Sequence, residues 1–290
     1  MLPSGPTLCR GGHVLVIGVD GVRFDVLGPE ATPSIWAFGR AGFLVPVPID
    51  EDTPTWSGPC WATIVTGRSV AEHGVTGNDL TGHRLAEYPD FVTLATRAGL
   101  PTLLAIGGWP PLALAEDGGP LFAEATRREF VPVTERSVAG WDAADETATA
   151  LATGVLAGPG VPRLSFVYLS AVDITGHVTG AGAAYRAAAQ VADERIGRLL
   201  AAVRSRPAEE AWTVVIVTDH GHLDGGGHGG REPEVTMAWA AAAGPGIDPG
   251  GPAPVTRQVE IAPLVLAGLC EPPRGEPPRG EPPLGGPPPG

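Results

Sequence analysis

The sequence predicts an α/β fold in which helices flank both faces of a mostly parallel central sheet. Three short apolar runs, at residues 14–19, 164–169 and 213–217, are typical of buried parallel strands. Each run is followed within a few residues by an aspartate, and a long segment with helical spacing lies between the second and third runs. Strands that alternate with helices favour a parallel sheet, whose ligands bind at the carboxyl ends of the strands. We therefore expect a functional site at this edge of the sheet.

Helical patterns connect the predicted strands. In residues 181–203 the apolar side chains recur at near-helical spacing. A proline directly after Thr32 is typical of a helix start, and a further helix is expected at residues 61–66. The segment 101–136 mixes Pro, Gly and charged residues and predicts only one strand, at 102–106.

The composition divides the chain into a folded part and a tail. With 290 residues, of which 43% are hydrophobic, the chain is long enough to bury a large core, and we expect one domain at residues 1–270. From residue 271 the repeat EPPRGEPPRGEPPLGGPPPG consists mostly of Pro and Gly. Because such a segment has too few apolar side chains to form a core, residues 271–290 are predicted to be a disordered tail.

Charge and residue usage exclude several classes of protein. The formal net charge is −13, which argues against nucleic-acid binding because affinity for the phosphate backbone depends on clustered positive charge. All 19 basic residues are Arg, so a lysine Schiff base and a P-loop lysine are both excluded. An anionic substrate needs a local source of positive charge, and bound metal ions are one such source.

Targeting signals are missing from the sequence, which predicts a soluble cytoplasmic protein. The N-terminus lacks a charged start followed by an apolar core, and no run of about 18 apolar residues occurs, so no membrane partner is expected. The three cysteines form no CxxC pair and are odd in number, which is typical of a reduced intracellular protein. The sequence leaves the oligomeric state open.

Acidic and histidine residues follow the predicted strands in a pattern that favours metal binding. They are Asp20, Asp173, His177, Asp219, His220 and His228. Asp173 and His177 are four residues apart, so one turn of helix or a compact loop can direct both side chains to one point. Two sets of three such ligands suit two divalent ions, with Zn²⁺ as the first choice and Mn²⁺ as the alternative. Two ions about 3.5 to 4 Å apart can hold the attacking and leaving oxygens of a displacement at phosphorus.

Ser57 is the predicted nucleophile. It lies in the loop TPTWSGPCW, which turns into a helix directly after it. At a helix N-terminus, free N–H groups and the helix dipole favour an anion. The hydroxyl can be activated by a bound metal ion, without a histidine base.

These residues lie in motifs that resemble those of the alkaline phosphatase superfamily. VLVIGVDGVRFDVL, TWSGPCWATIVTGRSVAEHGVTGN, VDITGH, VTDHGH, GGHGG and AAAGPG are similar, in order and spacing, to the nucleotide pyrophosphatase/phosphodiesterase and phosphonoacetate hydrolase branch. The motifs span residues 14–246. The resemblance implies an alkaline phosphatase-like catalytic domain, with its metal site at the carboxyl edge of the strands.

The resemblance also assigns roles to individual residues. One metal ion would be held by Asp20, Asp219 and His220. The other would be held by Asp173, His177 and His228. Ser57 would bridge the first ion to phosphorus, and the family register, counted eight residues back from Val65, gives the same serine as nucleophile. Asn78 matches the family asparagine that donates to a phosphate oxygen.

The activity that the resemblance implies is hydrolysis of a phosphodiester or pyrophosphate bond through a covalent phosphoserine intermediate. The substrate would be a small-molecule phosphate ester, with nucleotides among the candidates. A phosphomonoesterase or a phosphonate hydrolase on the same two-metal site is the alternative, and a noncatalytic metal-binding member of the fold is a remote one. The sequence argues against a sulfatase, because Trp61 stands where that family requires Arg. A haloacid dehalogenase-type phosphatase is excluded because Val22 stands where that family requires Asp.

Several other side chains have both a functional and a structural interpretation. A diesterase needs an apolar slot for the second ester group, and the candidates, which could equally be packed in the core, are Trp56, Trp61 and Trp109. His73 is expected to form structural hydrogen bonds. His222 is expected either to face solvent or to support a metal ligand. Arg23 could contact substrate or form an ion pair.

Overall fold

Seven strands of the described residues form one mixed sheet at the centre of the protein. The computed structural model describes residues 11–115 and 118–270, and the predicted tail at 271–290 lies outside this part of the chain. The strand order is β2-β7-β6-β1-β5-β3-β4, and β7 runs antiparallel to both of its neighbours. The strands are β1 His13–Val19, β2 Phe43–Pro48, β3 Thr102–Gly107, β4 Arg127–Val131, β5 Leu164–Leu169, β6 Trp212–Val217 and β7 Met237–Ala243.

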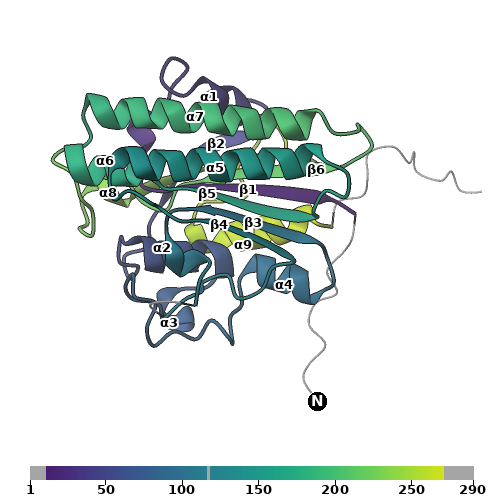
Figure 1. Cartoon of the computed structure of the whole chain (residues 1–290), viewed down its shortest axis with the longest axis horizontal. Helices are drawn as coiled ribbons and strands as arrows, with labels where there is room; N and C mark the ends of the chain where they lie inside the picture. The colour runs from purple at the N-terminus through teal and green to yellow at the C-terminus, as the bar shows by residue number, and fades with distance from the viewer. Residues whose placement is uncertain (1–10, 116–117, 271–290) are drawn as a thin grey trace, which may run out of the picture.

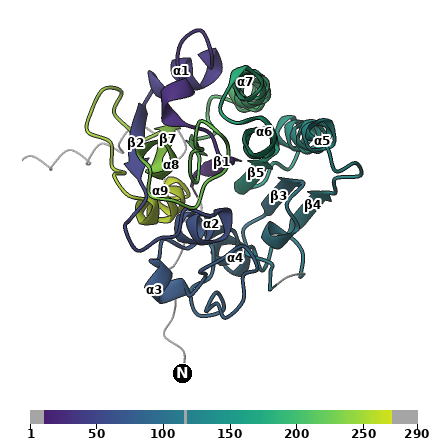
Figure 2. The ribbon, with the colours of Figure 1, turned by 90° about the vertical axis from the view of Figure 1, so that its left-hand side faces the viewer.

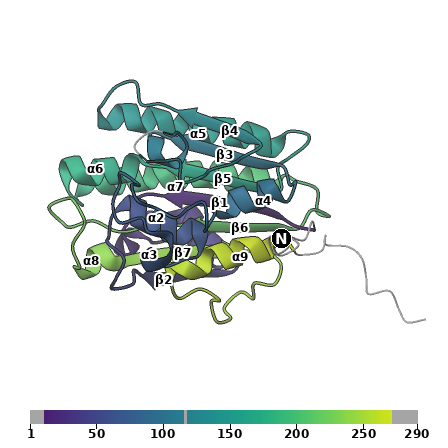
Figure 3. The same cartoon turned by 90° about the horizontal axis from the view of Figure 1, so that it is seen from below.

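Helices cover both faces of this sheet (Figure 1). The α-helices are α1 Pro33–Gly39, α2 Ser57–Thr66, α3 Val70–His73, α4 Phe91–Arg97, α5 Val138–Ala157, α6 Ala171–Thr179, α7 Ala183–Arg204, α8 Pro233–Thr236 and α9 Ile261–Gly268. α5 and α7 lie on one face, and α2, α4 and α9 lie on the other (Figure 3). The predicted fold class is therefore confirmed. None of the helices in the described part of the chain is long and apolar enough to cross a membrane.

Alternate side chains of the central strands belong to two different apolar layers. In β1, Val14 and Val16 pack in the layer with α2, α4 and α9, whereas Leu15 and Ile17 pack in the layer with α5 and α7. All four side chains are fully buried. Because both faces of β1 are covered, the strand is an unbroken apolar run instead of an alternating one.

The strands that the apolar runs predict are confirmed, with small changes at their ends. β5 covers the predicted residues 164–169, and β1 and β6 each begin one residue earlier than predicted. β3 extends the prediction at 102–106 by one residue. α7 is displaced by one or two residues from the predicted 181–203.

The sequence pattern does not predict three of the strands, and each has a physical reason. β2 contains Pro46 and Pro48, which a strand tolerates here because β2 lies at the edge of the sheet and pairs with β7 alone. β7 is rich in alanine, which has a low strand propensity. The expectation of a single strand in 101–136 is wrong because β4 also forms there, at the opposite edge, where its residues stay partly exposed and show no alternation.

Candidate metal centre and active site

Asp20 directly follows β1 and is almost completely buried. Its Oδ2 atom accepts hydrogen bonds from the indole N–H of Trp61, at 2.9 Å, and from the hydroxyl of Tyr168. The Trp61 ring can reach this position because Gly18 has no side chain. A Cβ on Gly18 would lie only 2.6 Å from the ring. The Oδ1 atom of Asp20 has no hydrogen-bond partner within the described residues. One oxygen of a buried carboxylate therefore remains available for a ligand.

Asp219 and His220 follow β6 and are fully buried. Asp219 Oδ1 accepts a hydrogen bond from the Gly21 backbone N–H at 3.1 Å, whereas its Oδ2 has no partner in the described part of the chain. His220 Nδ1 lies 3.1 Å from the Gly221 carbonyl oxygen, so Nδ1 carries the ring proton and Nε2 presents a lone pair. This Nε2 lies 3.2 Å from Asp219 Oδ2 and 3.6 Å from Asp20 Oδ1. We call these three side chains the first ligand group.

Ser57 is the first residue of α2, which therefore begins four residues before the predicted helix at 61–66. Its Oγ lies 3.3 Å from His220 Nε2. Asn78 Oδ1 accepts a hydrogen bond from the Gly58 backbone N–H at 2.7 Å. Because this bond occupies the amide oxygen, the Asn78 NH₂ group is left to donate into the cavity that Asn78 lines. A hydroxyl, an amide and a helix N-terminus thus adjoin the first ligand group.

The second ligand group consists of Asp173, His177 and His228. Asp173 and His177 are one turn apart on α6, with His177 Nε2 at 3.5 Å from Asp173 Oδ1. His228 comes from the glycine-rich loop after β6, and its Nε2 lies 3.0 Å from His177 Nε2 and 3.6 Å from Asp173 Oδ1. His228 Nδ1 lies 2.7 Å from the Thr55 carbonyl oxygen, so here too Nε2 presents the lone pair. The structure brings the six predicted ligands close together, but the groups whose ligand atoms all lie within 4.8 Å of one another differ from the two predicted sets: one is Asp173, His177, His222 and His228, and the other is Asp20, Asp173 and His220. Asp219 lies 3.2 Å from His220 Nε2 without joining either group, so the division of the six residues between two ions stays a prediction.

The spacing of these donor atoms fits transition-metal ions. Ligand atoms about 2.1 Å from a tetrahedral ion lie about 3.4 Å apart. The separations just described within the two groups lie between 3.0 and 3.6 Å. Asp173 adjoins both groups, because its carboxylate also lies within 4.8 Å of ligand atoms of Asp20 and His220. Carboxylates and imidazoles in this arrangement form a candidate metal-binding cluster.

The electrostatics of the buried groups favour bound cations as well. Burial, reinforced by the charge of Asp173, raises the pKa of Asp20 to about 7. Burial also raises the pKa of Asp173, and it raises the pKa of Asp219 well above its usual value. The same cause lowers the pKa of His220 and keeps its ring neutral. Three buried carboxylates this close to one another can be ionised together only if a positive charge compensates them.

His222 also belongs to the site, which the sequence interpretation left undecided. Its side chain is fully buried, so the expectation that it could face solvent is wrong. Its Nε2 lies 2.8 Å from Asp173 Oδ1. Burial lowers the pKa of His222 to about 4. The available signal was the spacing of His220 and His222, since side chains two residues apart in an extended segment point the same way.

A cavity of about 200 Å³ opens beside both ligand groups. Its lining includes Ser57 and the rings of Trp109 and Trp141. Trp141, which the sequence interpretation missed, lies in the first turns of α5 and packs across Gly108. A Cβ on Gly108 would lie 2.4 Å from the Trp141 ring, so the absence of a side chain there is what admits the ring. The cavity thus places the hydroxyl of Ser57 near two aromatic walls.

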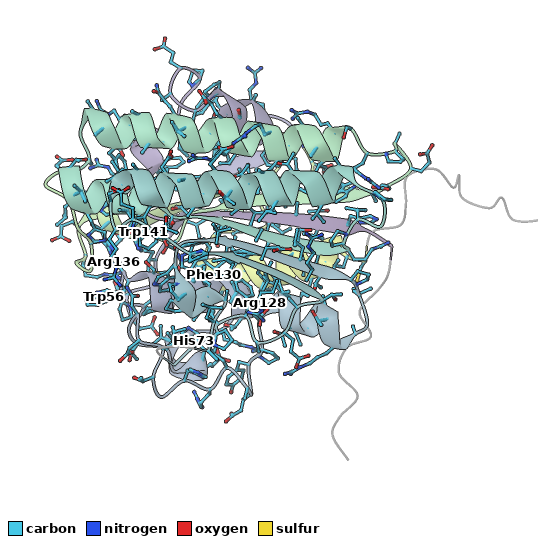
Figure 4. All side chains as sticks on the ribbon, in the orientation of Figure 1. Trp56, His73, Arg128, Phe130, Arg136 and Trp141 are labelled. Carbon is cyan, nitrogen blue, oxygen red and sulfur yellow. The ribbon has the colours of Figure 1, made fainter. Side chains whose placement is uncertain are left out.

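The three predicted slot tryptophans have different outcomes. Trp61 is fully buried in the core, so its proposed place in a substrate slot is wrong. Trp109 lines the cavity, whereas Trp56 is 47% exposed. Figure 4 shows Trp56, Arg136 and Trp141 at the end of the sheet where α2 and α6 gather, the end that Figure 2 views directly.

His73 and Arg23 have structural contacts. His73 is fully buried, with its Nε2 at 3.1 Å from the hydroxyl of Thr63 and its Nδ1 accepting a backbone N–H at 3.0 Å, which agrees with the predicted structural role. Arg23 forms ion pairs with Asp25 and Asp224, each at 2.6 Å. Its guanidinium is therefore engaged by carboxylates.

The fold is that of the alkaline phosphatase superfamily, and it carries a candidate metal site at the carboxyl edge of the strands. The sequence matches the family described as type I phosphodiesterase / nucleotide pyrophosphatase over residues 14–130 and 95–230. These matches run from β1 to the loop that carries His228, so the chain belongs to this family. No curated protein matches the sequence.

Similar solved structures include enzymes of several activities. A 2-O GAG sulfatase matches with a TM-score of 0.67 and 15% identity, over 90% of this chain and 71% of that one. Murine ectonucleotide pyrophosphatase / phosphodiesterase 5, as an inactive variant with AMP, matches with a TM-score of 0.53 and 22% identity, over 73% of this chain and 57% of that one. Phosphonoacetate hydrolase from Sinorhizobium meliloti, with phosphonoformate, matches with a TM-score of 0.53 and 16% identity, over 74% and 57%. The likeness at these identities concerns the fold, and this chain spans 57% of the last two proteins.

Proposed function

We propose that the protein hydrolyses a phosphodiester or pyrophosphate bond of a small molecule, with Ser57 as a covalent nucleophile. The observation that carries this proposal is the position of Ser57 Oγ, 3.3 Å from His220 Nε2 and on the wall of a cavity that both ligand groups reach. A site that only bound metal would have no need of a hydroxyl at a helix N-terminus. Membership of the phosphodiesterase family supports the same activity.

In this proposal each ligand group holds one divalent ion, Zn²⁺ first and Mn²⁺ as the alternative. The first group is Asp20, Asp219 and His220, together with Ser57. The second group is Asp173, His177 and His228. When bound, the ions supply positive charge that lowers the pKa of the serine hydroxyl and stabilises the charge that develops on the phosphoryl and leaving oxygens.

Ser57 acts by displacing the leaving group. Its hydroxyl gives its proton to solvent, Oγ forms a bond to phosphorus, and the bond from phosphorus to the leaving oxygen breaks. Water then attacks phosphorus and gives up a proton, the bond from phosphorus to Ser57 Oγ breaks, and Oγ takes up a proton, which restores the hydroxyl. Throughout, the Asn78 NH₂ group and the N–H groups at the start of α2 can donate to the phosphoryl oxygens.

The second ester group would lie between the aromatic walls of the cavity. Trp109 and Trp141 offer apolar surface beside Ser57, which suits a diester better than a monoester, whose second group is a charged oxygen. A cleft of about 540 Å³ adjoins this cavity, sharing Asn78 and Trp109 with it, and Arg136 lines its wall. The combined space accommodates a substrate larger than inorganic phosphate.

A comparison of substrates tests the proposal. Metal-analysed protein is assayed on bis-p-nitrophenyl phosphate, p-nitrophenyl phosphate and phosphonoacetate. We expect the largest kcat/KM on the diester, and loss of activity on chelation. A larger kcat/KM on the monoester or on phosphonoacetate would favour the alternative activities on the same site, and no turnover by fully metal-loaded protein would favour a noncatalytic metal-binding role.

A further inference from the structure

His222 has a ring nitrogen within 4.8 Å of the ligand atoms of Asp173, His177 and His228, yet it has no part in the chemistry proposed for the site. The ring packs against Gly176 of α6, where a Cβ would come 2.9 Å from three of its atoms. The ring of Tyr185, on α7, meets it edge-on with centroids 5.8 Å apart. These contacts hold the imidazole so that its Nε2 is directed at Asp173 Oδ1, 2.8 Å away.

The hydrogen-bond partners of His222 differ from those of the two neighbouring histidines. In His220 and His228, Nδ1 contacts a backbone carbonyl oxygen, so the proton sits on Nδ1 and Nε2 offers a lone pair. In His222, Nδ1 makes no hydrogen bond of standard geometry within the described residues, although the nearby Gly227 backbone raises the pKa of the ring, whereas Nε2 lies 2.8 Å from an oxygen of the Asp173 carboxylate, which accepts when it is ionised. Because a buried N–H without a partner is rarer than an unsatisfied acceptor, the proton belongs on Nε2.

We propose that His222 is a positioning residue, whose Nε2–H fixes the Asp173 carboxylate in the orientation that binds a metal ion. This inference rests on the proposed function, because it concerns the ion held with His177 and His228. Asp173 is the carboxylate that adjoins both ligand groups, so its orientation matters for the whole site. Hydrogen-bond donors to metal ligands act by restricting the ligand before the ion arrives.

Zinc binding to metal-free protein tests this role in variants of His222. His222→Met fills similar space without an N–H, whereas His222→Gln keeps an N–H near the original Nε2 position. We expect wild-type protein to bind two equivalents, and the methionine variant to bind one of them about 10- to 100-fold more weakly. The glutamine variant should recover most of that loss. His73→Gln, which changes a buried histidine outside the site, should bind zinc as the wild type does.

The outcomes separate this role from the proposed function. Two equivalents in the wild type with unchanged affinity in His222→Met would overturn the role of His222 alone, as would a glutamine variant as weak as the methionine one. Fewer than two equivalents in the wild type would overturn the metal assignments as a whole.

A second measurement needs no substitution and so does not depend on a variant that folds. NMR of the histidine ring nitrogens in zinc-loaded wild-type protein should show hydrogen on Nε2 of His222, and zinc on Nε2 of His220 and His228. Zinc on Nε2 of His222 would overturn the proposal, because His222 would then be a fourth ligand of the second group.

Discussion

The Nδ1 atom of His228 lies 2.7 Å from the carbonyl oxygen of Thr55, two residues before Ser57. The Thr55 hydroxyl donates in return to the Gly230 carbonyl oxygen, at 2.8 Å. Two hydrogen bonds therefore join the loop that precedes the proposed nucleophile to the loop that carries a proposed metal ligand. A displacement of either loop would misplace both groups.

Arg231 strengthens this junction and provides a prediction. Its guanidinium donates to the backbone carbonyls of Ile49, Asp50 and Thr53. Arg231→Met removes these bonds, which are partly exposed, at a cost of about 1 kcal/mol. We expect kcat/KM on the diester to fall by about 3- to 10-fold because the nucleophile loop loses part of its support.

Arg257→Met is the matched control, since Arg257 pairs with the side chain of Asp50 on the same segment, at 2.7 Å. That pair is exposed on the arginine side and should contribute little. Equal activity of the Arg231 variant and the wild type, or an equal loss in the Arg257 variant, would contradict a special role for Arg231.

Replacing Trp141 tests whether the aromatic wall recognises the second ester group. Trp141→Ala should raise KM for bis-p-nitrophenyl phosphate and change the inhibition constant of inorganic phosphate little, because phosphate has no group to place against the ring. Steady-state kinetics with both compounds measures this difference. Trp56→Ala, which changes a more exposed tryptophan, should leave both constants nearly unchanged. If Trp141→Ala weakens phosphate inhibition as much as diester binding, the ring supports the fold of the site instead of the substrate.

Asp20→Asn should stabilise the metal-free protein at alkaline pH. Burial raises the pKa of Asp20 to about 7 in the folded protein, from an ordinary value of 3.8. A carboxyl group with a raised folded-state pKa contributes stability below its unfolded pKa, and this contribution is lost as the pH rises through about 7. The gain in melting temperature of the chelated variant over chelated wild type should therefore be larger at about pH 8 than at about pH 5.

With zinc bound, the wild type should melt at a higher temperature than Asp20→Asn, because the variant lacks a charged ligand. Thermal melting with and without zinc, at both pH values, measures the effect. If the gain in melting temperature does not change with pH, burial does not raise the pKa of Asp20. If zinc stabilises the variant as much as the wild type, Asp20 does not belong to the first ligand group.

Residues placed by strand ends could be predicted from the sequence, whereas residues placed by packing could not. Asp20 and Asp219 directly follow or closely follow buried strands, so the apolar runs alone locate them at one edge of the sheet. Trp141 of α5 lines the cavity only because Gly108, directly after β3, has no side chain to block the ring. This contact joins two segments that are distant in the sequence. The partnership of His222 with Asp173 likewise depends on how α6 packs beside the loop after β6.

The strands that the sequence did not predict also depend on packing between distant segments. β2 and β7 are stabilised by pairing with each other, and neither sequence carries the pattern of a strand on its own. Local patterns therefore predict the central strands, and tertiary pairing decides the antiparallel edge.

The most direct test of the account is to trap the covalent intermediate. Rapid acid quench of the metal-loaded protein with bis-p-nitrophenyl phosphate, followed by mass spectrometry of its peptides, should find a p-nitrophenyl phosphoryl group on Ser57. Ser57→Ala should give no adduct and lose several orders of magnitude in kcat while its metal content is kept, and Ser57→Thr, which retains a hydroxyl, should keep measurable turnover. An adduct on Thr53, Thr55 or Cys60, or near wild-type turnover by Ser57→Ala, would contradict the assignment of Ser57 as the nucleophile.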